Sequence, residues 1–228
     1  MKKLILILLL LPAILLQQSC IVMVKSLAKG IVNDYDDYAD TNISSQTLLG
    51  ADGRTATINQ SFSGKTVYAV VYSSPLNHPH PGDSTRYAEM QNRFKPYKDV
   101  QFISVYNGDN EQYWREFSKK NRGGHEAYRL TDRDAEPWKG LGNVPHVLII
   151  GADGTILGYK APNTNSKVLA DYVLYQARSG KDATRSSKEV IKEINESGRF
   201  KSEQMKSWYT AHFKEPADNV SLSFSNSN

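Results

Sequence analysis

The sequence predicts an α/β fold, a three-layer α/β/α sandwich in which helices cover both faces of a mixed central sheet. Apolar, β-branched runs at residues 66–72 and 100–106 alternate with amphipathic helical patterns, as expected for strands joined by helices. A continuous apolar run at residues 147–150 is followed by Asp153-Gly154 and a second apolar run. This last pattern is typical of a buried strand, a tight turn and an antiparallel strand.

The charge distribution gives no sign of a nucleic-acid partner. The formal net charge is +4 over 228 residues, and acidic and basic residues are interspersed. Proteins that bind nucleic acid normally gather their basic residues into a stripe or patch. No nucleic-acid partner is therefore expected, and the length indicates one domain with appendages.

The first 20 residues predict a bacterial lipoprotein signal peptide. Lys2-Lys3 precedes a Leu/Ile-rich run at residues 4–16, and Cys20, the one cysteine of the chain, follows a small residue at the expected cleavage point. Such a cysteine carries the lipid, typically palmitate, although the Leu usual three positions earlier is Gln17 here. The alternative is an uncleaved anchor, because residues 4–24 could span a bilayer. Both readings tether the chain to the inner or outer membrane of a bacterial cell envelope.

Residues 21–44 are expected to be a tether between this anchor and the fold. Asp and Tyr occur irregularly over residues 33–40 without an apolar period, and residues 41–45 have the composition of a loop. The folded domain is therefore expected at residues 45–180, followed by a helical and disordered extension at residues 181–228.

Two helices are expected among the strands of the sheet. The first begins at Asp83 or Ser84, either of which suits an N-cap, and ends near Pro96. Its apolar face consists of Tyr87, Met90 and Phe94. The second begins at Asn110 and ends before Gly123-Gly124, with an inward face of Tyr113, Trp114 and Phe117.

The C-terminal third predicts three more helices. Residues 166–179 form the last helix of the domain, with an inward face of Val168, Leu169, Tyr172 and Val173. In the extension, residues 189–196 and 203–213 predict two short amphipathic helices, which either pack on the domain or form a surface for a partner. Disorder is expected from Pro216 onward.

Two segments carry motifs of a known fold family. In residues 143–157, Asn-Val-Pro-His is followed by an apolar strand and then by Asp-Gly-Thr-Ile. Upstream, residues 52–58 read Asp-Gly-Arg-Thr-Ala-Thr-Ile, and residues 64–72 consist of Gly-Lys and a buried strand. Both resemble the thioredoxin-like superfamily, in particular its branch of membrane-anchored TlpA and peroxiredoxin-like proteins. The resemblance covers about residues 45–180, and it implies a thioredoxin-like three-layer α/β/α sandwich.

The resemblance also implies a groove at the position of the family's redox site, without the residues that the redox reaction requires. A cis peptide bond is implied between Val144 and Pro145, which with His146 would form one wall of a groove facing the family's redox site. That site carries Trp-Cys-x-x-Cys in the family, but no cysteine lies within residues 21–228. Disulfide exchange and peroxide reduction both require a thiolate, so neither activity is expected.

Two catalytic or ligand-binding alternatives remain for the altered loop. Three imidazoles and a carboxylate would suit Zn²⁺ or Cu²⁺ if the fold brought them together: His78, His80, His146 and Asp83. The plain alternative is that the loop histidines are solvent-exposed and that His146 packs beside its strand, with no cofactor. A hydrolase would need one of Ser73, Ser74 and Ser84 as nucleophile, but no G-x-S-x-G motif surrounds them.

The remaining interpretation is a binding module. A thioredoxin-like groove beside a cis-proline presents free backbone groups that an extended peptide can pair with. The sequence thus predicts a redox-inactive thioredoxin-like lipoprotein that acts as a protein-binding or assembly module, whose partner is an unidentified envelope protein.

Overall fold

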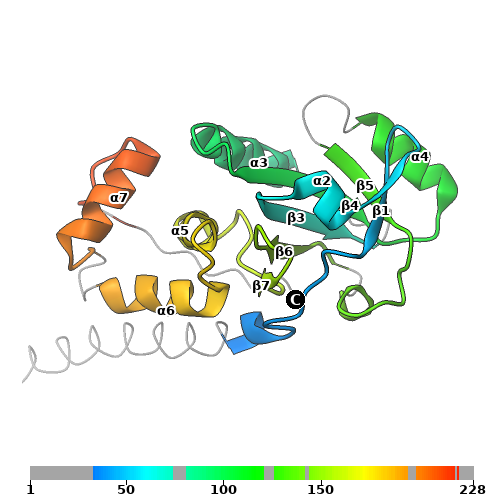
Figure 1. The fold of residues 1–228 in the computed structure, drawn as a ribbon. Coiled ribbons are helices and arrows are strands. Elements are labelled where there is room, and N and C mark those ends of the chain that lie inside the picture. Colours follow the sequence, from blue (N-terminus) through cyan, green and yellow to red (C-terminus); the bar gives the residue numbers. More distant parts are fainter. Residues whose placement is uncertain are drawn as a thin grey trace, which may run out of the picture.

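The computed structural model describes residues 33–73, 81–120, 126–141, 144–194, 199–218 and 220. Within these residues a seven-stranded sheet is covered by helices (Figure 1). The strands are β1 (Thr47–Gly50), β2 (Thr55–Thr57), β3 (Thr66–Tyr72), β4 (Val100–Tyr106), β5 (Glu126–Leu130), β6 (His146–Ile150) and β7 (Ile156–Gly158). The helices are η1 (Asn33–Asp36), α2 (Ile58–Phe62), α3 (Pro81–Phe94), α4 (Glu111–Lys120), η3 (Trp138–Gly140), α5 (Lys167–Ala177), α6 (Ala183–Glu193) and α7 (Glu203–Phe213).

The sheet is mixed, as the sequence predicted. Its order is β2-β1-β5-β4-β3-β6-β7. Strand β4 lies parallel to both β3 and β5, because helices α3 and α4 carry the chain back between them. Strands β6 and β7 form an antiparallel hairpin on the other side of β3, and β1 and β2 form a second antiparallel pair beside β5. This arrangement confirms the thioredoxin-like α/β fold.

The β6–β7 hairpin depends on Gly154. This residue has φ +87°, in the left-handed region that glycine adopts without strain, and its N–H donates to the carbonyl of Gly151 at 2.9 Å. A Cβ at Gly154 would also lie 2.5 Å from the Cβ of Ser44. Asp153 completes the turn, because its carboxylate accepts from the backbone N–H of Thr155 at 2.9 Å. The predicted Asp-Gly turn is therefore confirmed.

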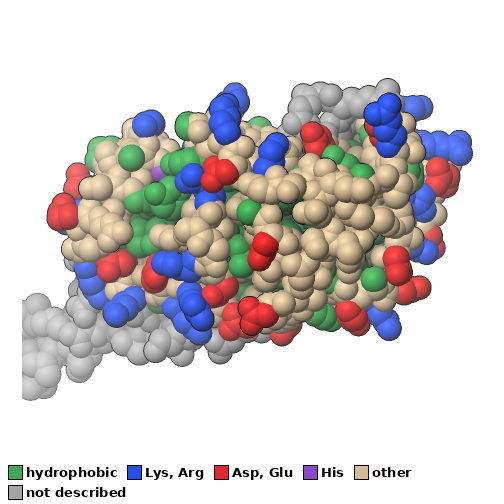
Figure 2. All heavy atoms as spheres, viewed as in Figure 1, with side chains coloured by type: hydrophobic (Ala, Val, Ile, Leu, Met, Phe, Trp, Pro, Cys, Tyr) green, Lys and Arg blue, Asp and Glu red, His purple; other side chains and the backbone are tan. Residues whose placement is uncertain are grey.

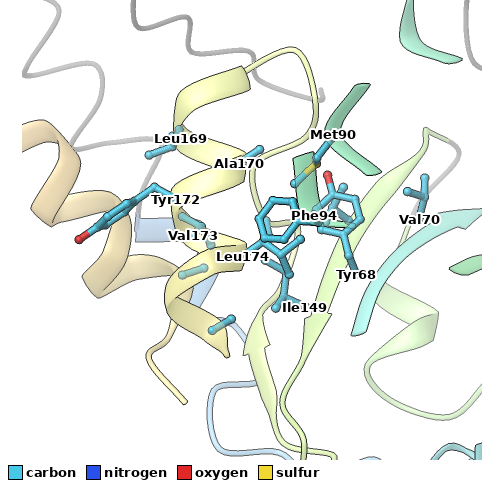
Figure 3. Packing of buried hydrophobic residues seen from close by; sticks show 14 of the residues in the cluster. Tyr68, Val70, Met90, Phe94, Ile149, Leu169, Ala170, Tyr172, Val173 and Leu174 are labelled. Atoms are coloured by element: carbon cyan, nitrogen blue, oxygen red, sulfur yellow. The ribbon is translucent and has the colours of Figure 1, made fainter. Parts of the chain in front are cut away.

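The sheet separates two hydrophobic cores. Every residue of β3 is buried, and alternate side chains point to opposite faces, so Tyr68 and Val70 enter one core while Val67 and Ala69 enter the other. The larger core also contains Met90 and Phe94 of α3 and most of α5, as the close-up shows (Figure 3). The smaller core is closed by α2, η3 and the chain around Ile43.

The expected tether is part of the fold from at least residue 33. Tyr35 is 7% exposed and Ile43 is 1% exposed. The backbone N–H of Ile43 donates to Gly154 and that of Ile156 donates to Thr41, both at 2.9 Å, so the segment runs along β7. The expectation of a solvated linker up to residue 44 was therefore wrong. The sequence gave no sign of burial here, because two buried side chains among many Asp residues form no detectable hydrophobic period.

The expected extension is likewise part of the domain. Helix α6 begins at residue 183 instead of 189, because Asp182 caps it by accepting from the N–H of Arg185 at 2.7 Å. Helix α7 has the predicted bounds, and both helices contribute to the larger core, as does Val220 beyond the expected onset of disorder. Helix α3 also begins slightly earlier than predicted, at Pro81, a residue that suits a first helical turn.

Among the described residues, no helix combines the length and the apolar character that crossing a bilayer requires. The predicted signal peptide and Cys20 lie outside the described residues.

Candidate functional site

The implied groove beside Pro145 is only partly described. Val144 and Pro145 are half-buried at the start of β6, whereas residues 74–80 of the facing loop, with His78 and His80, lie outside the described residues. The cis peptide bond among the described residues is Glu136–Pro137, so the expected cis bond between Val144 and Pro145 was wrong. The trans isomer is intrinsically favoured. A proline at the start of a strand is tolerated in either isomer, because no sheet hydrogen bond requires a backbone N–H at that position.

His146 is a buried, neutral side chain on the smaller core. It is 5% exposed, it lies opposite Val71 in the sheet, and it shares a face with Leu148 and Ile150. That face is the one opposite α3. Burial, and secondly the positive charge of Lys160, lower the pKa of His146 below its usual value. Its Nδ1 atom has no hydrogen-bond partner among the described residues.

The proposed metal ligands are not brought together in the described part of the chain. Within that part, no group of three or more His, Cys, Asp or Glu side chains could hold a metal ion. Asp83 belongs to the first turn of α3, but His78 and His80 lie outside the described residues. The ligand set therefore stays a prediction. The same holds for a serine nucleophile: Ser74 is not described, and Ser84 is exposed on α3.

A groove of about 690 Å³ lies between α5, the last helix of the predicted domain, and α6 and α7, which the sequence placed outside that domain. Its apolar lining is mainly aromatic: Tyr97, Tyr172, Tyr175, Met205 and Trp208. Its polar rim includes Gln176, Lys181, Glu189, Lys192, Glu193, Ser202, Gln204 and Ser207. Figure 2 shows hydrophobic side chains gathered on this side of the molecule, between α5 and α7.

The aromatic wall of the groove is held by ring contacts. Trp208 meets Tyr172 edge to face, with ring centroids 4.8 Å apart, and it also contacts Tyr175 at 6.0 Å. Tyr175 in turn meets Tyr97 at 5.8 Å. The guanidinium of Arg178 lies 4.3 Å from the ring centroid of Tyr97 and 5.5 Å from that of Tyr175. Such ring and cation–π contacts favour a preformed wall over one that assembles on binding.

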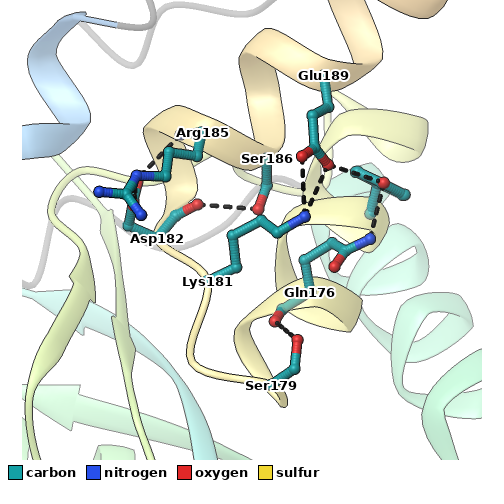
Figure 4. Close-up of polar contacts among 8 residues, drawn as sticks. Gln176, Ser179, Lys181, Asp182, Arg185, Ser186 and Glu189 are labelled. Carbon is teal, nitrogen blue, oxygen red and sulfur yellow. Dashed lines mark hydrogen bonds and ion pairs between the residues drawn. The ribbon is translucent and has the colours of Figure 1, made fainter.

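One side of the groove is a network of polar contacts between α5 and α6 (Figure 4). Glu189 accepts from Lys181 at 2.8 Å and from the hydroxyl of Tyr172 at 3.1 Å. Gln176 donates to the same hydroxyl at 2.7 Å. Burial, and secondly the charge of Glu189, raise the pKa of Tyr172, so this hydroxyl stays protonated as a donor. The cation and the carboxylate neutralise each other, which leaves this wall of the groove without net charge.

A buried ionic cluster holds α7 in place behind the groove. Asp171 of α5 is 0% exposed and accepts two hydrogen bonds from Arg93 of α3, at 2.5 Å from Nε and 3.2 Å from Nη2. The same carboxylate lies 2.8 Å from Nε2 of His212 on α7. The imidazole of His212 stacks on Trp208, with an interplanar angle of 14°, so the cluster also positions a groove side chain.

Sequence reasoning found this region only in part. Met205 and Trp208 belonged to the helix expected either to pack on the domain or to form a partner surface, and α7 does pack on the domain. Tyr175 was missed because it lies outside the inward stripe of α5. Tyr97 was missed because it follows α3 in a loop. No local signal connects these residues, since the groove exists only once α5, α6 and α7 have docked.

Comparisons with known proteins give likenesses of fold alone. No protein-family model matches the sequence, and no curated protein matches it. Similar solved structures include a protein from Bacteroides vulgatus assigned as a thiol-disulfide oxidoreductase, at 18% identity and a TM-score of 0.46 over 57% of this chain and 89% of that one. A thiol-disulfide oxidoreductase from Bacteroides fragilis has 13% identity and a TM-score of 0.45 over 54% and 92%. BsSco, a member of the Sco family of cytochrome c oxidase assembly proteins, has 14% identity and a TM-score of 0.42 over 65% and 99%.

Proposed function

We propose that this protein is a redox-inactive, thioredoxin-like lipoprotein of the bacterial cell envelope that binds another protein as an assembly module. The observation that carries the proposal is a thioredoxin-like sheet in a chain without a cysteine in residues 21–228. Thiol–disulfide exchange proceeds through a thiolate, and no other side chain replaces it in that reaction. The fold would therefore serve as a scaffold.

The membrane tether is supported by the sequence before the fold. Cys20 follows an apolar run and a small residue, and twelve residues separate it from Asn33, where the described structure begins. A single acyl chain anchors a protein only marginally, so stable attachment would require the further chains of a bacterial lipoprotein.

The groove between α5, α6 and α7 supports the binding role. Tyr and Trp are enriched where proteins bind other proteins, because they bury a large area and lose little conformational freedom. An apolar side chain from an extended segment of the partner would lie against Tyr175 and Trp208. The exposed rim residues Gln204 and Ser207 would then bond the backbone of that segment.

Crosslinking in living cells tests the binding role. A photoreactive amino acid at Gln204, on the groove rim, should yield a discrete protein adduct, whereas the same amino acid at Lys119 on α4 should not. The adduct should disappear with Trp208→Ala and with Ser207→Arg, which obstructs the groove from an exposed position. Identical adducts from both positions, or an adduct that survives Ser207→Arg, would contradict the groove as the binding surface.

A redox assay tests the other half of the proposal. In an insulin-reduction assay, the full chain and Cys20→Ala should both proceed at the rate of buffer alone. Turnover above that rate in the Cys20→Ala protein would overturn the assignment as redox-inactive, because that variant contains no thiol and its activity would have to come from another group.

A further inference from the structure

The charged residues that line the groove between α5, α6 and α7 balance one another. Lys181 and Lys192 supply two cations, and Glu189 and Glu193 supply two carboxylates. Lys181 lies 2.8 Å from Glu189, and the charge of Lys192 acts on the adjacent Glu193. A charged ligand would gain no net attraction from these four groups. The charges of the groove therefore favour an uncharged occupant.

Both carboxylates of the groove are already used as hydrogen-bond acceptors. Glu189 accepts from Lys181 through both of its oxygens, at 2.8 and 3.0 Å. Glu193 accepts from the backbone N–H of Ser202 at 2.9 Å. The ammonium of Lys192, a group that can only donate, is exposed and forms no hydrogen bond among the described residues. The groove thus offers a ligand hydrogen-bond donors more readily than charged acceptors.

Three aromatic rings form a row along the apolar side of the groove. The ring centroid of Tyr175 lies 5.8 Å from that of Tyr97 and 6.0 Å from that of Trp208, with interplanar angles of 72° and 48°. All three side chains are partly exposed. Rings tilted against one another in this way present edges as well as faces, so compact apolar groups can pack against them. The row therefore suits a series of small apolar side chains over at most about 12 Å.

We propose that the groove binds a proline-rich segment of the partner in the polyproline II conformation. The inference rests on the proposed function, because it names the chemistry of the segment that the same groove would take. Proline has no backbone N–H, so such a segment presents carbonyl acceptors and few donors. Aromatic-lined grooves are a recurrent binding site for segments of this kind. An uncharged, acceptor-rich segment complements a groove whose charges balance and whose carboxylates are occupied.

The dimensions of the groove fit one turn of a polyproline II helix. On α7 the lining residues run from Gln204 to Ala211, seven positions that correspond to about 10 Å. A polyproline II helix has three residues per turn and rises about 3.1 Å per residue, so residues i and i+3 lie on one side, about 9 Å apart. Prolines at these two positions would pack on the ring row, one on each side of Tyr175. Carbonyls between them would accept from donors at the rim, Lys192 among them.

An apolar segment without proline would bind this groove less well. Each of its residues brings a backbone N–H, and an N–H that is buried without an acceptor weakens binding. A proline-rich segment avoids this cost, and it is already extended before it binds, so it loses less conformational freedom.

Peptide binding to the full chain tests the proposal. Two uncharged, end-capped peptides of about twelve residues are compared by calorimetry, one repeating Pro-Ser-Thr and the other Val-Ser-Thr. The second peptide keeps an apolar residue at every third position but restores its N–H. The proline peptide should bind at least about tenfold more tightly, because one buried N–H without an acceptor accounts for a factor of that size. Equal affinities, or no binding of the proline peptide up to about 1 mM, would overturn the proposal.

Substitutions in the groove show where the peptide binds. Ser207→Arg places a long side chain on the rim and should weaken binding of the proline peptide at least several-fold. The matched control is Thr210→Arg, at an exposed position of the same helix that does not line the groove, and it should leave the affinity unchanged. Tyr175→Leu keeps an apolar side chain but removes the central ring, and it should also weaken binding. Equal affinities of Ser207→Arg and Thr210→Arg would place the peptide outside the groove and refute the proposal.

The crosslink at Gln204 separates this inference from the proposed function. If the cellular adduct forms and disappears with Ser207→Arg, while the proline peptide binds no better than the valine peptide, the groove remains a protein-binding surface and only the proline-rich occupant is refuted. If neither the adduct nor peptide binding is found, both proposals fail.

Discussion

Replacing Asp171 by Asn should destabilise the protein strongly, because this side chain holds three helices together. Its carboxylate is 0% exposed and is bonded by Arg93 of α3 and His212 of α7. An arginine remains charged at any pH of interest, so the substitution leaves the guanidinium, itself only 15% exposed, without its counter-charge. Breaking a buried ion pair from one side typically costs about 3–5 kcal/mol.

Urea unfolding of the full chain measures this cost. With a slope of about 1–3 kcal/mol per M, a loss of this size lowers the urea midpoint by on the order of 2 M. The matched control is Asp99→Asn. This residue pairs with Arg178 at 2.8 Å, but the two side chains are 41% and 26% exposed. Such partly solvated pairs contribute about 1 kcal/mol or less.

The comparison separates burial from pairing. Both variants remove one carboxylate charge from an Arg–Asp pair, and they differ in exposure and in the additional contact of Asp171 with His212. If Asp171→Asn shifts the midpoint no more than Asp99→Asn does, the buried cluster does not stabilise α7, and the reasoning fails. Fluorescence gives a second readout, because Trp208 stacks on His212 and should become more solvated when α7 loosens.

Three further measurements test other residues. The pKa of His146 is lower in the folded protein than its unfolded value of about 6.5, so burying the neutral imidazole contributes to the free energy of unfolding. This contribution is complete above pH 6.5 and is lost as the pH falls through the folded-state pKa. The free energy of unfolding then changes by at most about 1.4 kcal/mol per pH unit. The urea midpoint of His146→Leu should therefore fall less between pH 7.5 and pH 5 than that of the wild type. If the midpoints of both proteins fall equally, His146 is not the origin of the acid sensitivity. Labelling with a palmitate analogue should mark the wild type and not Cys20→Ser; label retained by the variant would rule out that attachment. If the loop histidines ligate Zn²⁺, calorimetry should show Zn²⁺ binding at pH 7.5 that weakens at pH 5.5 and disappears in His80→Ala. A Zn²⁺ affinity that is the same in the wild type and in His80→Ala would rule out this ligand set.

The strongly periodic parts of the fold were predictable from the sequence. Met90 and Phe94 recur on one face of a helix and are buried, and the Asp-Gly turn at Gly154 is the one that the local residues require. Strand β5 was not predicted, although it lies within the sheet between β1 and β4. Its residues include Glu126 and Arg129, so backbone pairing and not an apolar pattern places it there.

The candidate site was less predictable, because the groove forms only where α5, α6 and α7 pack against one another. Ser186 and Ser187 of α6 are 0% exposed, yet serine carries no signal of burial, so the first turns of this helix were assigned to no element. The groove depends on the cluster of Arg93, Asp171 and His212, which come from three helices far apart in the sequence. Such a cluster has no local pattern to detect.

The segment that runs along β7 has a consequence for aggregation. An uncovered edge strand offers unpaired N–H and C=O groups to any other extended chain, including a second copy of the protein. Here the N–H of Ile156 is already bonded to Thr41, and Asn42 bridges Thr155, so this edge is capped by the chain itself. At the opposite edge, β2 has only three residues. A soluble fragment trimmed to begin at residue 45 would uncover the β7 edge and should self-associate, whereas one that begins at residue 33 keeps it closed.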